Sequence, residues 1–338
     1  MMMNGRLAFR RALQGKNEGN PPFVPFIYGL AARTANVSLR DMVTDPGCYT
    51  NALEGVFRLL GYEVITTSYD TTIESEPWGS QIEWRGDYLA PVLVRAGNLL
   101  SVRPEDFLKG GRIPVVMEVT KRLVISAGRS AAIACVVGGP CSIVKGLQGS
   151  SGLTEPGSTS EAVKLLGGFL SKLVRSLCEL KVDAVFFRED PLGEELVGEL
   201  NLNKEAYIGL YATLFNIVRA FNGFPVLLTK HLTMDAVKDV HGLVRPDAIS
   251  LLGTAFDDTE LPALLELADN LRVSFGVPLP IGTDTPEALW DRLRGIESFV
   301  ARCRPRRFFY TSDGEIPHDT PMEVLHVLMD RLRAGTTP

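Results

Sequence analysis

The sequence predicts an α/β protein that folds as a (β/α)8 TIM barrel, and three observations support this prediction. Eight short apolar runs recur along the chain, and they alternate with stretches of helical character. The runs lack polar alternation, which is typical of parallel strands buried on both faces. Eight strand–helix units are also the number that closes a barrel. The runs cover residues 24–28, 64–68, 131–137, 184–187, 225–229, 248–252, 273–279 and 307–311.

The intervals between these runs carry the predicted helices. Residues 6–14 are expected to form an extra N-terminal helix outside the barrel, closed by Gly15. Residues 38–60 are predicted to form one long helix, with Ser38 as its N-cap and Gly61 at its end. Further helices are expected over residues 115–125, 159–180, 204–221, 234–240, 258–271, 286–302 and 321–332.

Two intervals differ from plain barrel connections. The one between the second and third strands is too long for a simple loop, and residues 81–84 and 92–95 within it have short-strand character. We expect a hairpin insertion there that covers the mouth of the barrel. The Gly/Ser-rich residues 146–160 are predicted to be a mobile active-site loop. Because no linker or longer repeat interrupts the pattern, we expect residues 1–338 to form a single domain.

Composition narrows the classes of partner. With a net charge of −5 and a pI near 5.6, the chain lacks the excess of positive charge that is typical of proteins that bind nucleic acid or an anionic membrane surface. Five cysteines without CxxC spacing suit a reducing compartment, and no apolar stretch is long enough to span a bilayer. We therefore expect a cytoplasmic protein that binds a small molecule, and a homodimer is compatible with these properties. A basic cluster at residues 302–307 is expected to be a solvated corner before the last strand rather than an anion site.

Several short motifs resemble the uroporphyrinogen decarboxylase superfamily. They are RLAFRRALQG at 6–15, LRDM at 39–42, TSYDTTIESEPWG at 67–79, SDGEIP at 312–317 and TPME at 320–323. Those at 39–42 and 67–79 are most similar to its corrinoid methyltransferase branch, which includes methylcobamide:coenzyme M and O-demethylase methyltransferases. The resemblance implies a barrel enzyme that moves a methyl group to or from a corrinoid. Because the sequence shows no cobalamin-binding motif, the corrinoid is expected on a partner protein.

The departures from the family pattern limit what the resemblance implies. In the methyltransferase branch, a His-x-Cys pair and a late Cys hold zinc, and the matching positions here are His231, Thr233 and Gly314. With both thiolates replaced, His231 is the one certain ligand. Carboxylates at Asp313 or Glu315 could substitute, but this harder ligand set would bind and activate a thiolate poorly, so functional zinc is not expected. The decarboxylase pattern also departs: Asp70 matches its aspartate, but few cations are available to bind a tetrapyrrole with many carboxylates. Uroporphyrinogen itself is therefore not the expected substrate.

Three residues are predicted to be catalytic. Asp70, after the second strand, could bind a cation or take a proton, or it could only cap the following turn. His231 follows the fifth strand, a position where a metal ligand or a general acid/base is expected in a barrel enzyme. It could equally be a hydrogen-bonded residue of the upper barrel. Glu189 and its neighbour Asp190 could orient substrate, with pairing to Arg188 as the alternative. The other predicted substrate- or cofactor-binding residues are Tyr28, Tyr69, Gly138, Gly139, Lys230, Asp284, Asp313 and Glu315.

Three functions compete at this stage. The leading hypothesis is methyl transfer between a small ether, amine or thiol and the partner's corrinoid, with His231 or a carboxyl group as the acid. The second is decarboxylation of a small carboxylic acid, with Asp70 stabilising positive charge. The third is a non-catalytic barrel that binds a tetrapyrrole or corrinoid.

Overall fold

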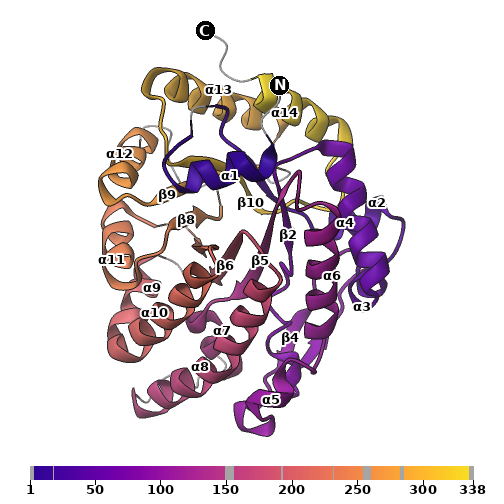
Figure 1. Cartoon of the computed structure of the whole chain (residues 1–338), viewed down its shortest axis with the longest axis vertical. Helices are drawn as coiled ribbons and strands as arrows, with labels where there is room; N and C mark the ends of the chain where they lie inside the picture. The colour runs from indigo at the N-terminus through magenta and orange to yellow at the C-terminus, as the bar shows by residue number, and fades with distance from the viewer. Residues whose placement is uncertain are drawn as a thin grey trace.

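The computed structural model describes residues 4–17, 19–148, 156–191, 193–230, 232–253, 260–281 and 285–334. Eight parallel strands form one sheet that curls into a nearly closed barrel, with helices around its outside (Figure 1). The predicted fold class is confirmed, and each predicted strand corresponds to an observed one. The strands are β1 (Phe23–Phe26), β2 (Val64–Thr67), β5 (Ala132–Gly138), β6 (Ala184–Glu189), β7 (Phe224–Thr229), β8 (Ala248–Leu251), β9 (Ser274–Leu279) and β10 (Phe308–Glu315).

The strand order β1-β10-β9-β8-β7-β6-β5-β2 leaves a seam where β1 and β2 meet. Pro25 lies in β1 and has no N–H to donate to a neighbouring strand. Side chains bridge the seam instead. The Thr66 hydroxyl donates to the Pro25 carbonyl at 3.0 Å, and the Phe23 N–H donates to the Glu63 carboxylate at 2.9 Å.

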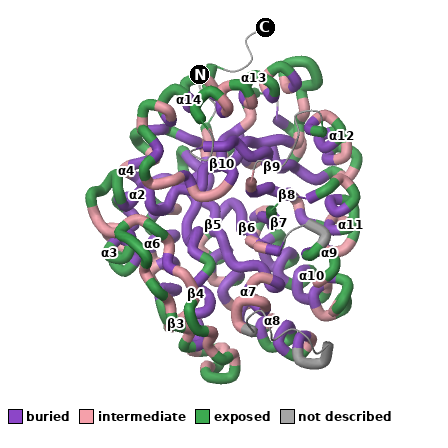
Figure 2. The backbone as a smooth tube through the Cα atoms, turned by 180° about the vertical axis from the view of Figure 1, so that it is seen from behind, coloured by how far each residue is buried: buried purple, intermediate pink, exposed green. Residues whose placement is uncertain are grey.

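Helices surround the strands, which form the buried centre of the molecule (Figure 2). Helix α1 lies at the end where the strands begin: its Phe9 contacts the Phe309 ring with centroids 5.9 Å apart, and the Ser274 hydroxyl donates to the Ala12 carbonyl at 2.9 Å. The helices are α1 (Gly5–Leu13), α2 (Gly29–Thr34), α3 (Leu39–Thr44), α4 (Pro46–Leu60), α5 (Pro104–Phe107), α6 (Ile113–Ser126), α7 (Pro140–Gln148), α8 (Pro156–Glu179), α9 (Gly193–Leu202), α10 (Lys204–Ala220), α11 (Met234–Val244), α12 (Leu261–Leu271), α13 (Pro286–Cys303) and α14 (Met322–Ala334). No helix in these described ranges is both long and apolar enough to cross a membrane.

The prediction of one helix over residues 38–60 is wrong. The structure has α3 and α4, separated at Asp45, because Pro46 cannot donate the next helical hydrogen bond and disfavours helical backbone before it. The Asp45 side chain then caps α4 by accepting from the Cys48 N–H at 2.5 Å. The predicted ends of the segment are confirmed: Ser38 caps α3, and Gly61 has a φ of 65°.

The insertion after β2 contains the predicted hairpin. Strands β3 (Gln81–Glu83) and β4 (Val92–Arg95) pair in antiparallel fashion. Short 3-10 turns, η1 (Glu76–Trp78) and η2 (Leu99–Ser101), flank it before α5 and α6. The loop predicted over residues 146–160 is partly helical, since its described ends belong to α7 and α8, and its centre lies outside the described residues.

Candidate active site at the barrel mouth

A cavity of about 550 Å³ opens at the carboxyl ends of the strands. Residues that follow or end β2, β6, β7, β8 and β10 line it, together with Ala90 from the hairpin insertion. Barrel enzymes carry their chemistry at this end. The lining residues are Tyr69, Asp70, Thr71, Ala90, Arg188, Lys230, Leu252, Gly253, Asp313, Gly314 and Glu315. The structure therefore brings Tyr69, Asp70, Lys230, Asp313 and Glu315, all of them predicted site residues, into one cavity.

Glu315 is the titratable group of this cavity whose proton affinity suits acid catalysis. Burial raises its pKa to about 7, although its Oε1 accepts a hydrogen bond from the Gly29 N–H at 2.7 Å and Arg188 lies nearby. A Cβ on Gly29 would lie 2.1 Å from the Tyr88 carbonyl oxygen. Only glycine therefore allows the backbone at position 29 to lie so close to Tyr88. A carboxyl group that exchanges its proton near neutral pH can act as a general acid.

Two cations face the same cavity. The Arg188 guanidinium lies over the Tyr69 ring, 4.7 Å from its centroid, and donates to the Asp190 carboxylate at 3.1 Å. Lys230 is exposed, and within the described part of the chain it makes no ion pair. Together they could hold an anionic group of a substrate. The pairing of Arg188 with Asp190 had been the alternative interpretation of this strand end.

Asp70 is held in a buried ion pair that the sequence did not reveal. Its Oδ2 accepts from Arg112 at 2.6 Å and from the Tyr28 hydroxyl at 3.3 Å, and its Oδ1 accepts from the Thr72 N–H at 2.8 Å. Arg112 also donates to Glu76 through Nε at 2.7 Å. The Asp70 carboxylate thus fixes the insertion to the barrel and also caps the next turn. Its oxygens are already engaged, so it has little capacity left to bind a substrate. Arg112 immediately precedes α6, and no motif marks it.

Glu189 does not face the mouth, which corrects its predicted catalytic role. Successive residues of a strand point to opposite faces, so Arg188 lines the cavity while Glu189 points outward beneath α7. There it accepts from the Cys141 N–H at 3.1 Å, the Ser142 N–H at 2.8 Å and the Tyr211 hydroxyl. Burial raises its pKa to about 7. Its role is to anchor the start of α7.

Gly138 and Gly139 have different surroundings. A Cβ on Gly139 would lie 2.2 Å from Glu189 Cδ, so this glycine serves the α7 anchor rather than a ligand. Gly138 donates its N–H to Glu74 Oε1 at 3.1 Å and lines a smaller cavity of about 240 Å³ beside the mouth. This side cavity shares Thr71 and Arg188 with the mouth cavity. Its other lining residues are Thr72, Ser75, Pro91, Val92, Leu93, Gly138, Ser142, Ile143, Gly146, Leu147 and Asp190.

Two predicted site residues, His231 and Asp284, lie outside the described residues. The remaining zinc positions do not fit a thiolate-bound metal. The Thr233 hydroxyl is used to cap α11 by accepting from the Ala236 N–H at 3.2 Å, and Gly314 has no side chain. Among the residues that the structure describes, no three His, Cys, Asp or Glu side chains are grouped to hold a metal ion.

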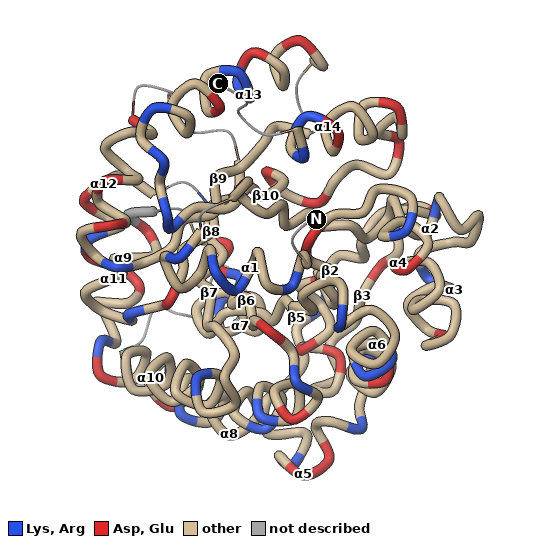
Figure 3. The backbone as a smooth tube through the Cα atoms, turned by 45° about the horizontal axis from the view of Figure 1, so that its top comes forward, with Lys and Arg blue, Asp and Glu red and all other residues tan. Residues whose placement is uncertain are grey.

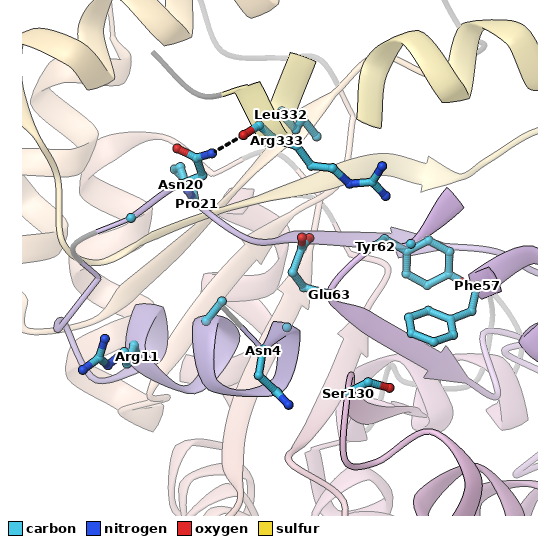
Figure 4. Close-up of a pocket in the computed structure, with 14 residues that line it drawn as sticks. Asn4, Arg11, Asn20, Pro21, Phe57, Tyr62, Glu63, Ser130, Leu332 and Arg333 are labelled. Carbon is cyan, nitrogen blue, oxygen red and sulfur yellow. Dashed lines mark hydrogen bonds between the residues drawn. The ribbon is translucent and has the colours of Figure 1, made fainter. Parts of the chain in front are cut away.

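A larger cavity, about 710 Å³, lies elsewhere, between α1, the start of β1 and the end of α14 (Figure 4). Asn20 donates to the Arg333 carbonyl at 2.7 Å across it, and the Phe57 and Tyr62 rings form one wall. Glu63 lines it, but its carboxylate is engaged by the β1–β2 seam. Because this cavity lies at the amino ends of the strands, it is not the candidate active site.

Comparison with known proteins agrees with the sequence motifs. The model of the uroporphyrinogen decarboxylase (URO-D) family matches residues 5–167. The predicted resemblance to this family is confirmed. The URO-D match covers α1, the first two barrel strands, the insertion, β5 and α7. No curated protein matches the chain.

Solved structures show the same fold over most of the chain. A methyltransferase from Methanosarcina mazei is 15% identical with a TM-score of 0.76, and the similarity covers 98% of this chain and 99% of that one. A B12-independent methionine synthase from Shewanella sp. W3-18-1, in complex with selenomethionine, is 16% identical with a TM-score of 0.52, covering 85% and 86% of the two chains. At these identities the likeness concerns the fold alone.

Proposed function

We propose that this protein is a methyltransferase-like enzyme that moves a methyl group between a small ether, amine or thiol and a corrinoid carried by a partner protein. The URO-D match and the fold shared with a methyltransferase support the enzyme class. The observation that carries the proposal is Glu315, a half-buried carboxyl group with a pKa raised to about 7, in the wall of a charged cavity at the barrel mouth.

In this proposal Glu315 supplies the proton that the leaving group needs. Methyl ethers and amines are poor electrophiles, and protonation of the oxygen or nitrogen makes the bond to the methyl carbon easier to break. The bond's electron pair stays on the protonated heteroatom, which leaves as an alcohol or amine. The partner's corrinoid, in its reduced form at the barrel mouth, would supply the electron pair for the new bond to the methyl carbon. Arg188 and Lys230 would orient an anionic part of the substrate.

A second candidate function is decarboxylation of a small carboxylic acid. The presence of Arg188 and Lys230 in the same cavity favours it, because two cations could hold a carboxylate. After carbon dioxide leaves, Glu315 would protonate the carbon that keeps the electron pair. The Arg112 ion pair of Asp70 makes that residue a poorer choice than Glu315 for this chemistry.

The test combines the purified protein with a methyl-accepting corrinoid protein and a panel of ethers, amines and thiols. We expect methyl transfer, read from the corrinoid absorbance spectrum, and a loss of at least about 100-fold in Glu315→Gln. Glu83→Gln, an exposed carboxylate of the hairpin, is the matched control and should keep full activity. Absence of transfer with every substrate would contradict the proposal. Release of carbon dioxide without a corrinoid would favour the second function.

A further inference from the structure

A polar cavity of about 540 Å³, here called the basal cavity, lies at the opposite end of the barrel from the candidate active site. It is formed where α1 ends and where the chain enters β8, β9 and β10. Its lining residues are Leu13, Gln14, Lys16, Arg219, His241, Arg245, Pro246, Asp247, Arg272 and Arg307. Lys and Arg segments are visible beside α1 and near the starts of these strands (Figure 3). No step of the proposed methyl transfer uses this cavity.

Positive charge is concentrated in the basal cavity far beyond what the chain's composition requires. Its lining has five cationic residues and one carboxylate, although the whole chain has a net charge of −5. The carboxylate, Asp247, is paired with Arg219 at 2.6 Å. The charged groups of the other four cations make no ion pair or hydrogen bond with any residue that the structure describes, although the Arg245 carbonyl accepts from Arg219 at 2.6 Å. These four are Lys16, Arg245, Arg272 and Arg307. Lys16, Arg245 and Arg272 are exposed, so water screens their mutual repulsion, and a bound anion would give these cations direct partners.

Two of these arginines occupy backbone positions that normally favour glycine. Arg245 ends α11 with a φ of 52°, and Arg272 ends α12 with a φ of 56°. Left-handed backbone after a helix is usually taken by glycine, since a Cβ is unfavourable there. Arg304 ends α13 in the same way with a φ of 47° but does not line the cavity, so this backbone conformation is not confined to the cavity; at Arg245 and Arg272 it occurs at residues that line it.

A third arginine is placed by a close contact with a glycine. A Cβ on Gly15 would lie 2.7 Å from the Arg307 Cζ, so the absence of a side chain at Gly15 lets this guanidinium rest on the backbone after α1. Burial and the nearby Arg245 charge lower the pKa of His241. At neutral pH its ring therefore contributes a hydrogen-bonding group rather than another positive charge.

We propose that the basal cavity is a binding site for a compact multivalent phosphate anion, such as pyrophosphate or the phosphate groups of a small phosphorylated metabolite. Guanidinium groups present paired N–H donors that match phosphate oxygens, and several of them can bind one anion together. The described lining contains no Phe, Tyr or Trp on which a nucleobase could stack, and Leu13 and Pro246 are its only aliphatic members. A small polyanion therefore fits the lining better than a nucleotide recognised through its base.

The test is isothermal titration of the full chain with inorganic pyrophosphate at low ionic strength, with sulfate as the comparison anion. Arg245→Gly and Arg272→Gly each remove one cation while placing glycine in a backbone conformation that suits it, so the fold is preserved. We expect pyrophosphate to bind the wild type more tightly than sulfate, and each variant to bind it about ten-fold more weakly. Arg306→Ala removes an exposed arginine next to Arg307 but outside the cavity, and its affinity should equal that of the wild type.

Three outcomes would overturn the proposal. The wild type could fail to bind pyrophosphate, or bind it no better than sulfate. Arg245→Gly and Arg272→Gly could retain wild-type affinity. Arg306→Ala could lose as much affinity as they do, which would reveal a diffuse positive field rather than a site.

Discussion

The Asp70 carboxylate and the Arg112 guanidinium lie 2.6 Å apart, with side chains 0% and 8% exposed. We predict that Asp70→Ala lowers the free energy of unfolding by about 1.5–3 kcal/mol, because Arg112 keeps Glu76 as its only carboxylate partner and the buried Tyr28 hydroxyl and Thr72 N–H lose their acceptor. Urea denaturation of the purified variant measures this. The control is Glu83→Ala, which breaks the exposed pair with Arg85 at 3.5 Å and should cost less than about 1 kcal/mol. Equal losses in both variants would mean that the Asp70 pair contributes no more than a surface pair.

The second residue-scale prediction concerns the pH dependence of activity. If Glu315 donates the proton, the active enzyme is the form with this carboxyl group protonated. Since its pKa is raised to about 7, the protonated fraction falls as the pH rises through that value, and kcat should fall with it. The remaining activity of Glu315→Gln should lack this alkaline decline. An unchanged pH profile in the variant would assign the acid to another group.

Prediction from sequence was weakest in deciding whether the side chain of a strand residue points into the barrel or outward to the helices. The ends of the strands could be located, so Tyr69, Lys230 and Glu315 were correctly expected near the mouth. For Arg188 and Glu189 the choice between faces failed. The strand before them is buried on both sides, and without polar alternation nothing in the sequence indicates which residue faces inward.

At the scale of helices, local sequence signals predicted where a helix begins and ends better than they predicted whether it is continuous in between. The apolar face of residues 38–60 continues through Asp45 and Pro46, which favoured one helix over two, although the Asp-Pro pair itself is a stop and start signal. Helix α2 was not predicted because its six residues are too few to show helical periodicity. The Arg112 ion pair was out of reach for a different reason: it joins residues 42 positions apart.

The left-handed arginines yield a prediction about element stability that is independent of ligand binding. Glycine at the position of Arg272 removes the unfavourable Cβ contact of a left-handed residue, so Arg272→Gly should raise the free energy of unfolding by about 0.5–1 kcal/mol. Arg306→Gly is the matched control, because Arg306 is exposed and does not have a positive φ. There glycine only increases the entropy of the unfolded chain, and stability should fall or stay level. A loss of stability in Arg272→Gly would show that its side chain also supports the fold.

At the scale of the whole molecule, the fold was predictable because it repeats. Eight apolar runs alternate with helices, and this regularity survives errors in single elements. What the repeat does not specify is how the barrel closes. The β1–β2 seam depends on the Glu63 and Thr66 side chains, which carry no periodic signal in the sequence.

Three carboxyl groups, of which two are buried and Glu315 is half-buried, make the stability of the whole molecule depend on pH. Burial raises the pKa of Glu74, Glu189 and Glu315 to about 7 in each case. Between an unfolded value of about 4.3 and this folded value, the native state binds more protons than the unfolded state. The free energy of unfolding should therefore be highest, as far as these groups are concerned, below about pH 4.3 and fall as the pH rises toward about 7, by up to roughly 4 kcal/mol per group.

Urea denaturation at a series of pH values from about 5 to 8 measures this slope. Glu74→Gln is the informative variant, because one carboxylate oxygen of Glu74 is buried with no hydrogen-bond partner in the described structure, and the neutral amide keeps the side-chain shape. It should make the decline shallower by about a third, since one of three similar contributions is removed. Glu83→Gln, at an exposed position, should reproduce the wild-type slope. A slope that is flat in the wild type, or unchanged in Glu74→Gln, would mean that these carboxyl groups are ionised in the folded protein and that burial does not hold their protons.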